Sequence, residues 1–321
     1  MSGSTRLSSL PVLQDLPLGT NVLDAGSSET YPTGDEPGSE RPPPWLRVRA
    51  NGAGKSLDLE RMLKKRRLHT VCSSAACPNL GECWGSGTAT FMILGNECTR
   101  ACRFCDVKTN ARPKPIDLDE PQRLVEAAML MELKHVVITS VTRDDAPDGG
   151  AAIFAACIEG LKKANPNITV EVLTPDFQGQ NAPLYAVLDA GCEVFNHNLE
   201  TIERLQRTIR SGAKYDRSLR FLQEAKRHRP DVITKSGMML GLGETDEELR
   251  QGIRDLREHD VDNLTLGQYL RPSRWHHEVV RYAHPDLFLE LKEFAEELGF
   301  AYVESGPLVR SSYHAERGLT S

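Results

Sequence analysis

From about residue 88 onward, short apolar runs rich in β-branched residues alternate with segments of helical pattern, and this alternation restricts the fold most. Strands separated by helices predict parallel βαβ units, because one parallel strand can follow another only after a crossover connection. Two helix starts are marked locally: Asp119 precedes Pro121, and Thr245 has Glu248 at the spacing of a capping box. The predicted strands are 90–94, 135–141, 168–174, 194–198, 233–240, 263–269 and 301–303.

This number of strands favours a partial α/β barrel over the eight-fold form, with a doubly wound sheet as the alternative. The predicted fold class is therefore α/β, a partial parallel barrel of (β/α)6 type with N-terminal and C-terminal extensions. In either architecture the functional residues are expected where the carboxyl ends of the strands meet. The expected segments are a disordered or surface-wrapping stretch (1–45), an extension (46–87), the barrel (88–303) and a tail (304–321).

The chain has eight cysteines, and six of them lie within a 34-residue window. Disulfides need an oxidising compartment, yet the N-terminus shows no basic segment followed by an apolar one, and a chain of 321 residues needs no covalent staples. Thiolate ligands to metal are the better interpretation. The window holds two trios, namely Cys72, Cys77 and Cys83, then Cys98, Cys102 and Cys105, whereas the isolated Cys157 and Cys192 are predicted to be buried small side chains.

Composition argues against two classes of protein. Lys and Arg number 39 against 45 Asp and Glu, so the net charge of −6 argues against a binder of nucleic acid. The apolar stretches fall short of the roughly 20 residues of a membrane-spanning helix, and the N-terminal segment lacks the Arg-rich, acid-poor character of a mitochondrial transit peptide. We therefore expect a soluble bacterial cytoplasmic protein. A helix predicted over 57–68 carries a basic run from Arg61 to Arg67, interpreted as a solvated face in preference to a docking patch.

The second trio of cysteines has the spacing C-x3-C-x2-C, directly after the predicted strand 90–94. Three thiolates can hold three irons of a 4Fe-4S cluster and leave the fourth iron open, which is typical of catalysis. Zinc is the alternative, but it needs a fourth ligand at finger spacing that this loop lacks. With Phe104 before the last cysteine, the loop resembles the signature of radical SAM enzymes. The resemblance implies that the open iron binds S-adenosylmethionine (SAM), whose reductive cleavage yields a 5'-deoxyadenosyl radical.

The first trio, C-x4-C-x5-C, leads into this loop through residues 77–95, and the combination resembles the lipoyl synthase family, in which both motifs occur in this order. The resemblance covers about residues 45–316. It continues through residues 137–145, 148–150, 195–201, 235–245, 266–270 and 309–315.

The resemblance implies an auxiliary 4Fe-4S cluster on Cys72, Cys77 and Cys83, completed by Ser312, with Ser311 as the less favoured neighbour. That cluster supplies two sulfur atoms inserted at C6 and C8 of a protein-bound octanoyl chain. The implied partners are octanoylated lipoyl domains of 2-oxoacid dehydrogenases or the glycine-cleavage H protein, and flavodoxin or ferredoxin as reductant, with no nucleic acid and no membrane. The alternatives are a biotin-synthase-like or other radical SAM thiolation, and a non-catalytic protein whose cysteines bind zinc.

Polar side chains after the predicted strands are the candidates for contacts with SAM. Asn198 and Glu200 lie in a run similar to one in biotin synthase, and the similarity implies that they bind ribose hydroxyls; Asn198 is also predicted to be a helix N-cap. Asp145, beside Arg143, is a candidate acceptor from the ammonium group, with a salt-bridged loop as the equal alternative. Arg210 is a weaker candidate for pairing with the SAM carboxylate.

Overall fold

The computed structural model describes residues 42–46, 61–71 and 79–319. The predicted N-terminal stretch up to residue 41 lies outside the described residues, and so do Cys72 and Cys77. Of the helix predicted over 57–68, residues 61–65 are helical, and 57–60 fall outside the described part. Within the described ranges, no helix has the length and apolar character needed to cross a membrane.

One mostly parallel sheet forms the centre of the fold, in the order β1-β2-β5-β6-β7-β8-β9-β10. Each predicted strand is present, but β10 continues past the expected barrel boundary at residue 303. The sequence did not predict β1, which pairs antiparallel with β2. The strands are β1 (His69–Thr70), β2 (Thr88–Ile93), β5 (His135–Ser140), β6 (Thr169–Leu173), β7 (Val194–Asn196), β8 (Ile233–Leu240), β9 (Asn263–Gln268) and β10 (Tyr302–Gly306), beside a separate parallel pair, β3 (Glu97–Cys98) and β4 (Lys108–Thr109).

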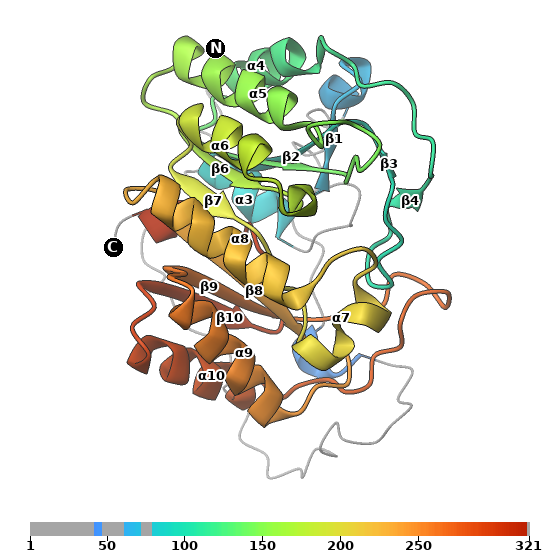
Figure 1. Cartoon of the computed structure of the whole chain (residues 1–321), viewed down its shortest axis with the longest axis vertical. Coiled ribbons are helices and arrows are strands. Elements are labelled where there is room, and N and C mark those ends of the chain that lie inside the picture. Colours follow the sequence, from blue (N-terminus) through green and yellow to red (C-terminus); the bar gives the residue numbers. More distant parts are fainter. Residues whose placement is uncertain (1–41, 47–60, 72–78, 320–321) are drawn as a thin grey trace, which may run out of the picture. The chain divides into compact units, whose positions relative to one another are not determined.

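The parallel strands follow one another in chain order without reversal, so right-handed crossovers place their helices on one face of the sheet (Figure 1). A doubly wound sheet would reverse its order, and the arrangement is therefore the partial (β/α)6 barrel. The helices are α3 (Leu80–Ser86), α4 (Glu120–Leu130), α5 (Ala151–Ala164), α6 (Asn181–Asp189), α7 (Glu203–Ile209), α8 (Tyr215–His228), α9 (Asp246–Glu258) and α10 (Pro285–Glu297), with short 3-10 turns η1 (Pro44–Leu46), η2 (Phe177–Gly179) and η3 (Ala315–Leu319).

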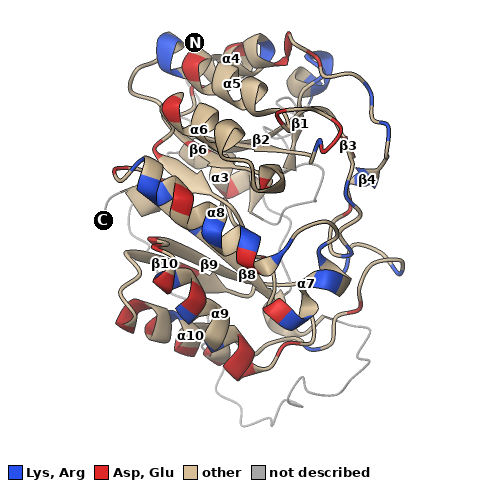
Figure 2. Cartoon of the chain, viewed as in Figure 1, with Lys and Arg blue, Asp and Glu red and all other residues tan. Residues whose placement is uncertain are grey.

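Helix α9 illustrates how the sequence pattern builds the core. Its buried residues Leu249, Ile253 and Leu256 recur at helical spacing and belong to the same hydrophobic cluster as Leu264 and Leu266 of β9. The other residues of this helix are mostly charged, and Figure 2 shows acidic and basic positions along the ribbons of α8, α9 and α10. Because side chains alternate along a strand, the odd-numbered residues of β9 face away from these helices, toward the barrel interior.

A buried polar network fills part of that interior. Lys235 Nζ donates to both carboxylate oxygens of Glu171 at 3.0 Å, and Asn196 Nδ2 donates to Glu171 Oε1 at 2.9 Å. Burial lowers the pKa of His135 to about 3, so its ring is neutral at neutral pH. The ring instead hydrogen-bonds Thr169 Oγ1 at 2.8 Å through Nδ1. The barrel is therefore held by a satisfied ion pair as well as by its apolar outer layer.

We expect Lys235→Met to lower the free energy of unfolding by about 3–5 kcal/mol, because it leaves the fully buried Glu171 carboxylate without its cation. Urea titration of the anaerobically purified protein measures this. The exposed Lys163→Met is the control, with an expected change within about 0.5 kcal/mol. A double variant, Lys235→Met with Glu171→Leu, should recover part of the loss; a loss equal to the sum of the single changes would contradict the pairing.

Candidate functional site

The Cys98–Cys105 loop follows the carboxyl end of β2, where the fold places functional residues. Leu94 (φ 68) and Gly95 (φ 88) turn the chain out of the strand, and the backbone N–H of Leu94 donates to the buried Glu120 Oε2 at 2.7 Å. The β3–β4 pair then joins the two ends of the loop. These contacts fix the base from which the three thiols project.

The three thiols lie close enough to affect one another electrostatically. Burial raises the pKa of Cys102 to about 12 and that of Cys105 to about 11, and the charge of Cys98 contributes to both shifts. Cys98 Sγ accepts hydrogen bonds from the backbone N–H groups of Arg100 (3.4 Å) and Thr142 (3.3 Å). Half-buried thiols with raised pKa values become thiolate ligands when a metal compensates their charge. The donor set therefore fits the three-thiolate side of a 4Fe-4S cluster.

Within the described residues, no group of three or more His, Cys, Asp or Glu side chains converges on the position of a single metal ion. A 4Fe-4S cluster binds each of its thiolates to a different iron. Its ligands therefore need not meet at one point.

Backbone contacts hold the far side of the Cys loop between two other segments. Arg103 N donates to Ile209 O, at the end of α7, at 2.8 Å, and Arg103 O accepts from His277 N at 2.8 Å. His276 Nε2 lies 3.2 Å from Cys105 O. The loop is thus clamped by the end of α7 and by the segment after β9.

Arg210 is brought next to this loop as a largely buried guanidinium, 9% exposed. It donates to Ser218 Oγ at 2.9 Å and to His197 Nε2 at 3.1 Å. Burial lowers the pKa of Arg210, and the negative charges of Glu200 and Cys102 oppose that shift. Its hydrogen-bond partners are neutral, because burial holds the pKa of His197 at about 3. A buried cation with neutral partners beside the thiols suits an anionic ligand.

Asn198 and Glu200 reach the same site from the end of β7. Burial raises the pKa of Glu200, while the charge of Arg210 and a hydrogen bond with Asn198 lower it. The Asn198 side chain is not a helix N-cap, and that prediction is wrong: α7 begins at Glu203 with Ile202 as its N-cap. Within the described part of the chain, the buried Asn198 Oδ1 has no hydrogen-bond partner. An unpartnered amide oxygen is open to a ligand hydroxyl, and the ribose contact stays a prediction.

Arg143 and Asp145 bind one another in the structure. Arg143 Nε donates to Asp145 Oδ1 and Nη2 donates to Oδ2, both at 2.8 Å, in a bidentate pair. Helix α5, which follows, has Gly150 as its N-cap, and the carboxylate of Asp148 accepts from the N–H groups of Gly150 and Ala152. This arrangement matches the salt-bridged loop, and a role for Asp145 in binding SAM stays a prediction.

The C-terminal tail brings Ser312 to Cys83. The two residues line one small hollow together with Thr88 and Thr90 of β2. Ser311 does not line it. Of the predicted auxiliary ligands, Cys83 and Ser312 are thus placed together, while Cys72 and Cys77 lie outside the described residues.

Polar contacts anchor this tail to α3. Tyr313 OH donates to Glu82 Oε2 at 3.2 Å, and His314 Nε2 lies 3.1 Å from Glu82 Oε1. Asn79 Nδ2 donates to Leu308 O at 3.0 Å. These contacts link residues more than 200 positions apart in the sequence.

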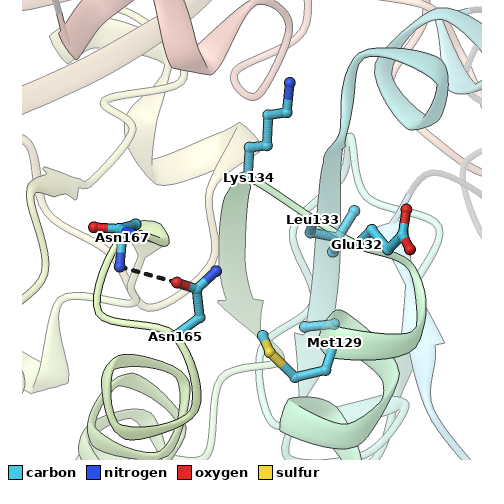
Figure 3. A pocket seen from close by; sticks show the side chains of 7 residues that line it. Met129, Glu132, Leu133, Lys134, Asn165 and Asn167 are labelled. Carbon is cyan, nitrogen blue, oxygen red and sulfur yellow. Dashed lines mark hydrogen bonds between the residues drawn. The ribbon is translucent and has the colours of Figure 1, made fainter.

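A second hollow lies beside the amino ends of β5 and β6 (Figure 3). Lys134 and Asn167 line it, and Asn167 N donates to Asn165 Oδ1 at 3.0 Å. In α/β barrels the catalytic residues lie at the carboxyl ends of the strands, not at the amino ends. Its lining includes no thiol and no residue of the candidate site.

Sequence reasoning missed three charged residues: Arg100 within the Cys loop, and Asp176 and Arg217 beside it. Arg100 pairs with Asp144 and Asp176, and Arg217 also pairs with Asp176. Asp176 stands just after β6, so the rule that functional groups follow strand ends was a usable signal for it.

Comparisons with known proteins show the family of this chain. Residues 92–256 match the radical SAM superfamily. Among solved structures, the fold resembles SuiB of Streptococcus suis bound to precursor peptide SuiA (TM-score 0.54, 12% identity, 78% of this chain and 53% of that chain). It also resembles the hydrogenase maturase HydG of Carboxydothermus hydrogenoformans (TM-score 0.51, 12% identity, 81% and 70%). These two likenesses concern the fold alone. The fold, the Cys loop and the superfamily match together define a radical SAM protein.

Relatives of much higher sequence identity show which family of radical SAM proteins this chain belongs to. The chain is 56% identical over 284 residues to the lipoyl synthase of Methylococcus capsulatus, which covers 88% of both chains. It is 51% identical over 277 residues to the lipoyl synthase of Shouchella clausii, covering 86% of this chain and 89% of the relative. The chain belongs to the lipoyl synthase family.

Proposed function

We propose that this protein inserts two sulfur atoms, at C6 and C8, into an octanoyl chain carried on a protein lysine, and so forms the lipoyl group. Aliphatic carbon has no useful acidity, so a general base cannot activate these positions. When bound, a 4Fe-4S cluster and SAM supply a carbon radical that can remove such hydrogens. The observation that carries the proposal is the hollow that Cys83 and Ser312 both line beside β2, because it brings together two of the proposed ligands of a second cluster.

The residues of this chain divide into two groups under the proposal. Cys98, Cys102 and Cys105 hold the radical-generating cluster, and the neighbouring polar residues bind SAM: Arg210 its carboxylate, Asn198 and Glu200 its ribose, and Asp145, paired with Arg143, its ammonium group. Cys72, Cys77, Cys83 and Ser312 hold the auxiliary cluster. A serine oxygen is a harder donor than a thiolate and suits a bond that must break when the cluster gives up sulfur.

Anaerobic incubation with SAM, dithionite and an octanoylated lipoyl-domain peptide tests the proposal, with mass analysis of the peptide for added sulfur. The protein should be brown and contain about eight irons, as two 4Fe-4S clusters require. Formation of 5'-deoxyadenosine without sulfur addition would leave only the superfamily chemistry. A colourless zinc protein would contradict the proposal altogether.

Replacing Ser312 with alanine should reduce sulfur addition by roughly tenfold to a hundredfold, because the auxiliary cluster loses its fourth protein ligand. Formation of 5'-deoxyadenosine should continue, since the Cys98–Cys105 loop is unchanged. Ser311→Ala is the matched control, being the adjacent hydroxyl that does not line the hollow. Normal sulfur addition by Ser312→Ala, or an equal loss in both variants, would reject the ligand assignment.

The proposed carriers are lipoyl domains of 2-oxoacid dehydrogenases or the glycine-cleavage H protein, and the proposed reductant is flavodoxin or ferredoxin. Thiolate ligands persist in a reducing compartment, which supports a cytoplasmic location. Lipoyl domains are often acidic, so an exposed basic surface suits them. Lys64, Lys65 and Arg67 are exposed, and Arg66 is half-buried.

Reversing Lys64, Lys65, Arg66 and Arg67 to glutamate should raise the KM for an intact acidic carrier protein several-fold, because steering between opposite charges is lost. The KM for a short octanoylated peptide should stay the same and serves as the control. Kinetics on the carrier should also lose their dependence on ionic strength. Unchanged kinetics on the intact carrier would rule out this surface as the docking site.

A further inference from the structure

A cluster of charged side chains surrounds Arg100, which stands between Cys98 and Cys102, and its members have no role in the function proposed above. The Arg100 side chain is only 7% exposed. Its Nε donates to Asp144 Oδ2 at 2.7 Å, while its Nη2 donates to Asp144 Oδ1 at 2.9 Å and to Asp176 Oδ1 at 2.7 Å. A planar guanidinium held by two carboxylates has a fixed position and orientation.

Asp176 is the centre of this cluster, and its side chain is fully buried at 0% exposure. Arg217 of α8 donates from Nε to Asp176 Oδ2 at 2.8 Å, and the N–H of Gln178 donates to Oδ1 at 3.1 Å. Burial alone would raise the pKa of Asp176, but its hydrogen bond and charge interaction with Arg100, reinforced by Arg217, hold that pKa well below its ordinary value. The carboxylate therefore stays ionised and binds two guanidinium groups at once.

The surrounding chain leaves Arg100 little room to adopt another position. A Cβ atom at Gly212 would lie 3.2 Å from both Cδ and Nε of Arg100. Thr99 Oγ1 accepts from the N–H of Asp144 at 3.0 Å, and the N–H of Arg100 itself donates to Cys98 Sγ at 3.4 Å. The segment between Cys98 and Cys102 is thus tied to Asp144, in the loop after β5, and to Asp176, in the loop after β6.

We infer that Asp176 is a positioning residue for the radical-generating cluster: acting through Arg100, it fixes the conformation in which the loop presents Cys98 and Cys102. The inference rests on the proposed function for the identity of that cluster. The backbone between two ligands loses conformational freedom when a cluster binds, and a segment already held in place avoids that cost. The charges of Arg100, Asp144, Asp176 and Arg217 sum to zero, so the arrangement fixes the loop without adding net charge beside the thiolates.

Two guanidinium groups on one carboxylate provide a matched comparison, because Arg100 belongs to the Cys loop and Arg217 to α8. The test uses full-length protein in which Cys72, Cys77 and Cys83 are replaced by alanine, so that all iron belongs to one cluster. Arg100→Gln and Asp176→Asn should each release iron to a chelator about tenfold faster or more, whereas Arg217→Gln should stay within about twofold of the parent. Arg100→Lys, which keeps the charge but not the fork, should fall between.

A second readout is the EPR spectrum of the reduced cluster with SAM. It should broaden in Arg100→Gln and Asp176→Asn and keep the parental line shape in Arg217→Gln. The double variant Arg100→Gln/Asp176→Asn should be no worse than the more affected single variant, because both changes remove the same link. Melting temperatures are measured alongside, and if Asp176→Asn does not fold, the comparison of Arg100→Gln with Arg217→Gln decides.

Two results would overturn the inference. Equal iron release from Arg217→Gln and Arg100→Gln would mean that the charges support the fold in general. Unchanged iron release, with midpoint potentials shifted in opposite directions by Arg100→Gln and Asp176→Asn, would mean that they act by charge and not by position. Absence of any 4Fe-4S cluster from the parent would contradict the proposed function itself, so the two failures are distinguishable.

Discussion

Cys102→Ala is expected to abolish the cleavage of SAM, lowering 5'-deoxyadenosine formation by roughly 10⁴-fold or more, the scale seen when an indispensable group is removed. Cys102 is the central thiol of the loop, and Arg210 and both other cysteines act on its pKa. Two remaining thiolates cannot hold three irons of a 4Fe-4S cluster. The measurement is chromatographic detection of 5'-deoxyadenosine in anaerobic reactions with SAM and dithionite.

Cys157→Ala is the control, since Cys157 is a thiol outside the loop that lies within the hydrophobic core, 0% exposed. It should cost about 1 kcal/mol of stability and leave SAM cleavage intact. Appreciable 5'-deoxyadenosine formation by Cys102→Ala would show that this loop is not the radical-generating site.

Cys83→Ala has the second large effect, because it should separate the two halves of the proposed reaction. Iron content should fall from about eight to about four per chain as the auxiliary cluster is lost. Sulfur addition to the octanoylated peptide should disappear, while 5'-deoxyadenosine still forms. The structural basis is the hollow that Cys83 shares with Ser312.

Cys192→Ala, another thiol at 0% exposure, is the control for Cys83→Ala and should keep both clusters and full sulfur addition. If Cys83→Ala protein still adds sulfur with four irons per chain, the sulfur does not come from the auxiliary cluster. If it loses SAM cleavage as well, the two sites are not separable as proposed.

The central part of each predicted strand was correct, and so was the capping box of Thr245 and Glu248. Such features depend on residues close in the sequence, through apolar periodicity and a local hydrogen-bond pair. The short β1 and the full extent of β10 were missed, because their length depends on pairing with β2 and β9, which are remote in the chain.

The wrong N-cap role for Asn198 has the same cause. Asn is a favoured N-cap residue, but β-bridge pairing continues to Glu200 through Met238 and delays the start of α7. The Asn198 side chain instead lies against Gly237, where an added Cβ would come within 3.0 Å of its Oδ1. The surroundings of the Asn198 side chain thus depend on Gly237 of β8, which is distant in the sequence.

The sequence by itself determined the α/β class, the two cysteine trios and the family resemblance, because motif spacing and strand–helix alternation are properties of neighbouring residues. Only the tertiary structure decided which distant groups meet. It placed Arg210 beside Cys102 and Asp176 against Arg100, and it brought Ser312, which the family resemblance had already assigned to the auxiliary cluster, beside Cys83. The physical reason is that the partners of a buried charge or hydroxyl lie far away in the sequence. The crossover connections and the C-terminal tail bring them into contact. Patterns of neighbouring residues do not predict those contacts.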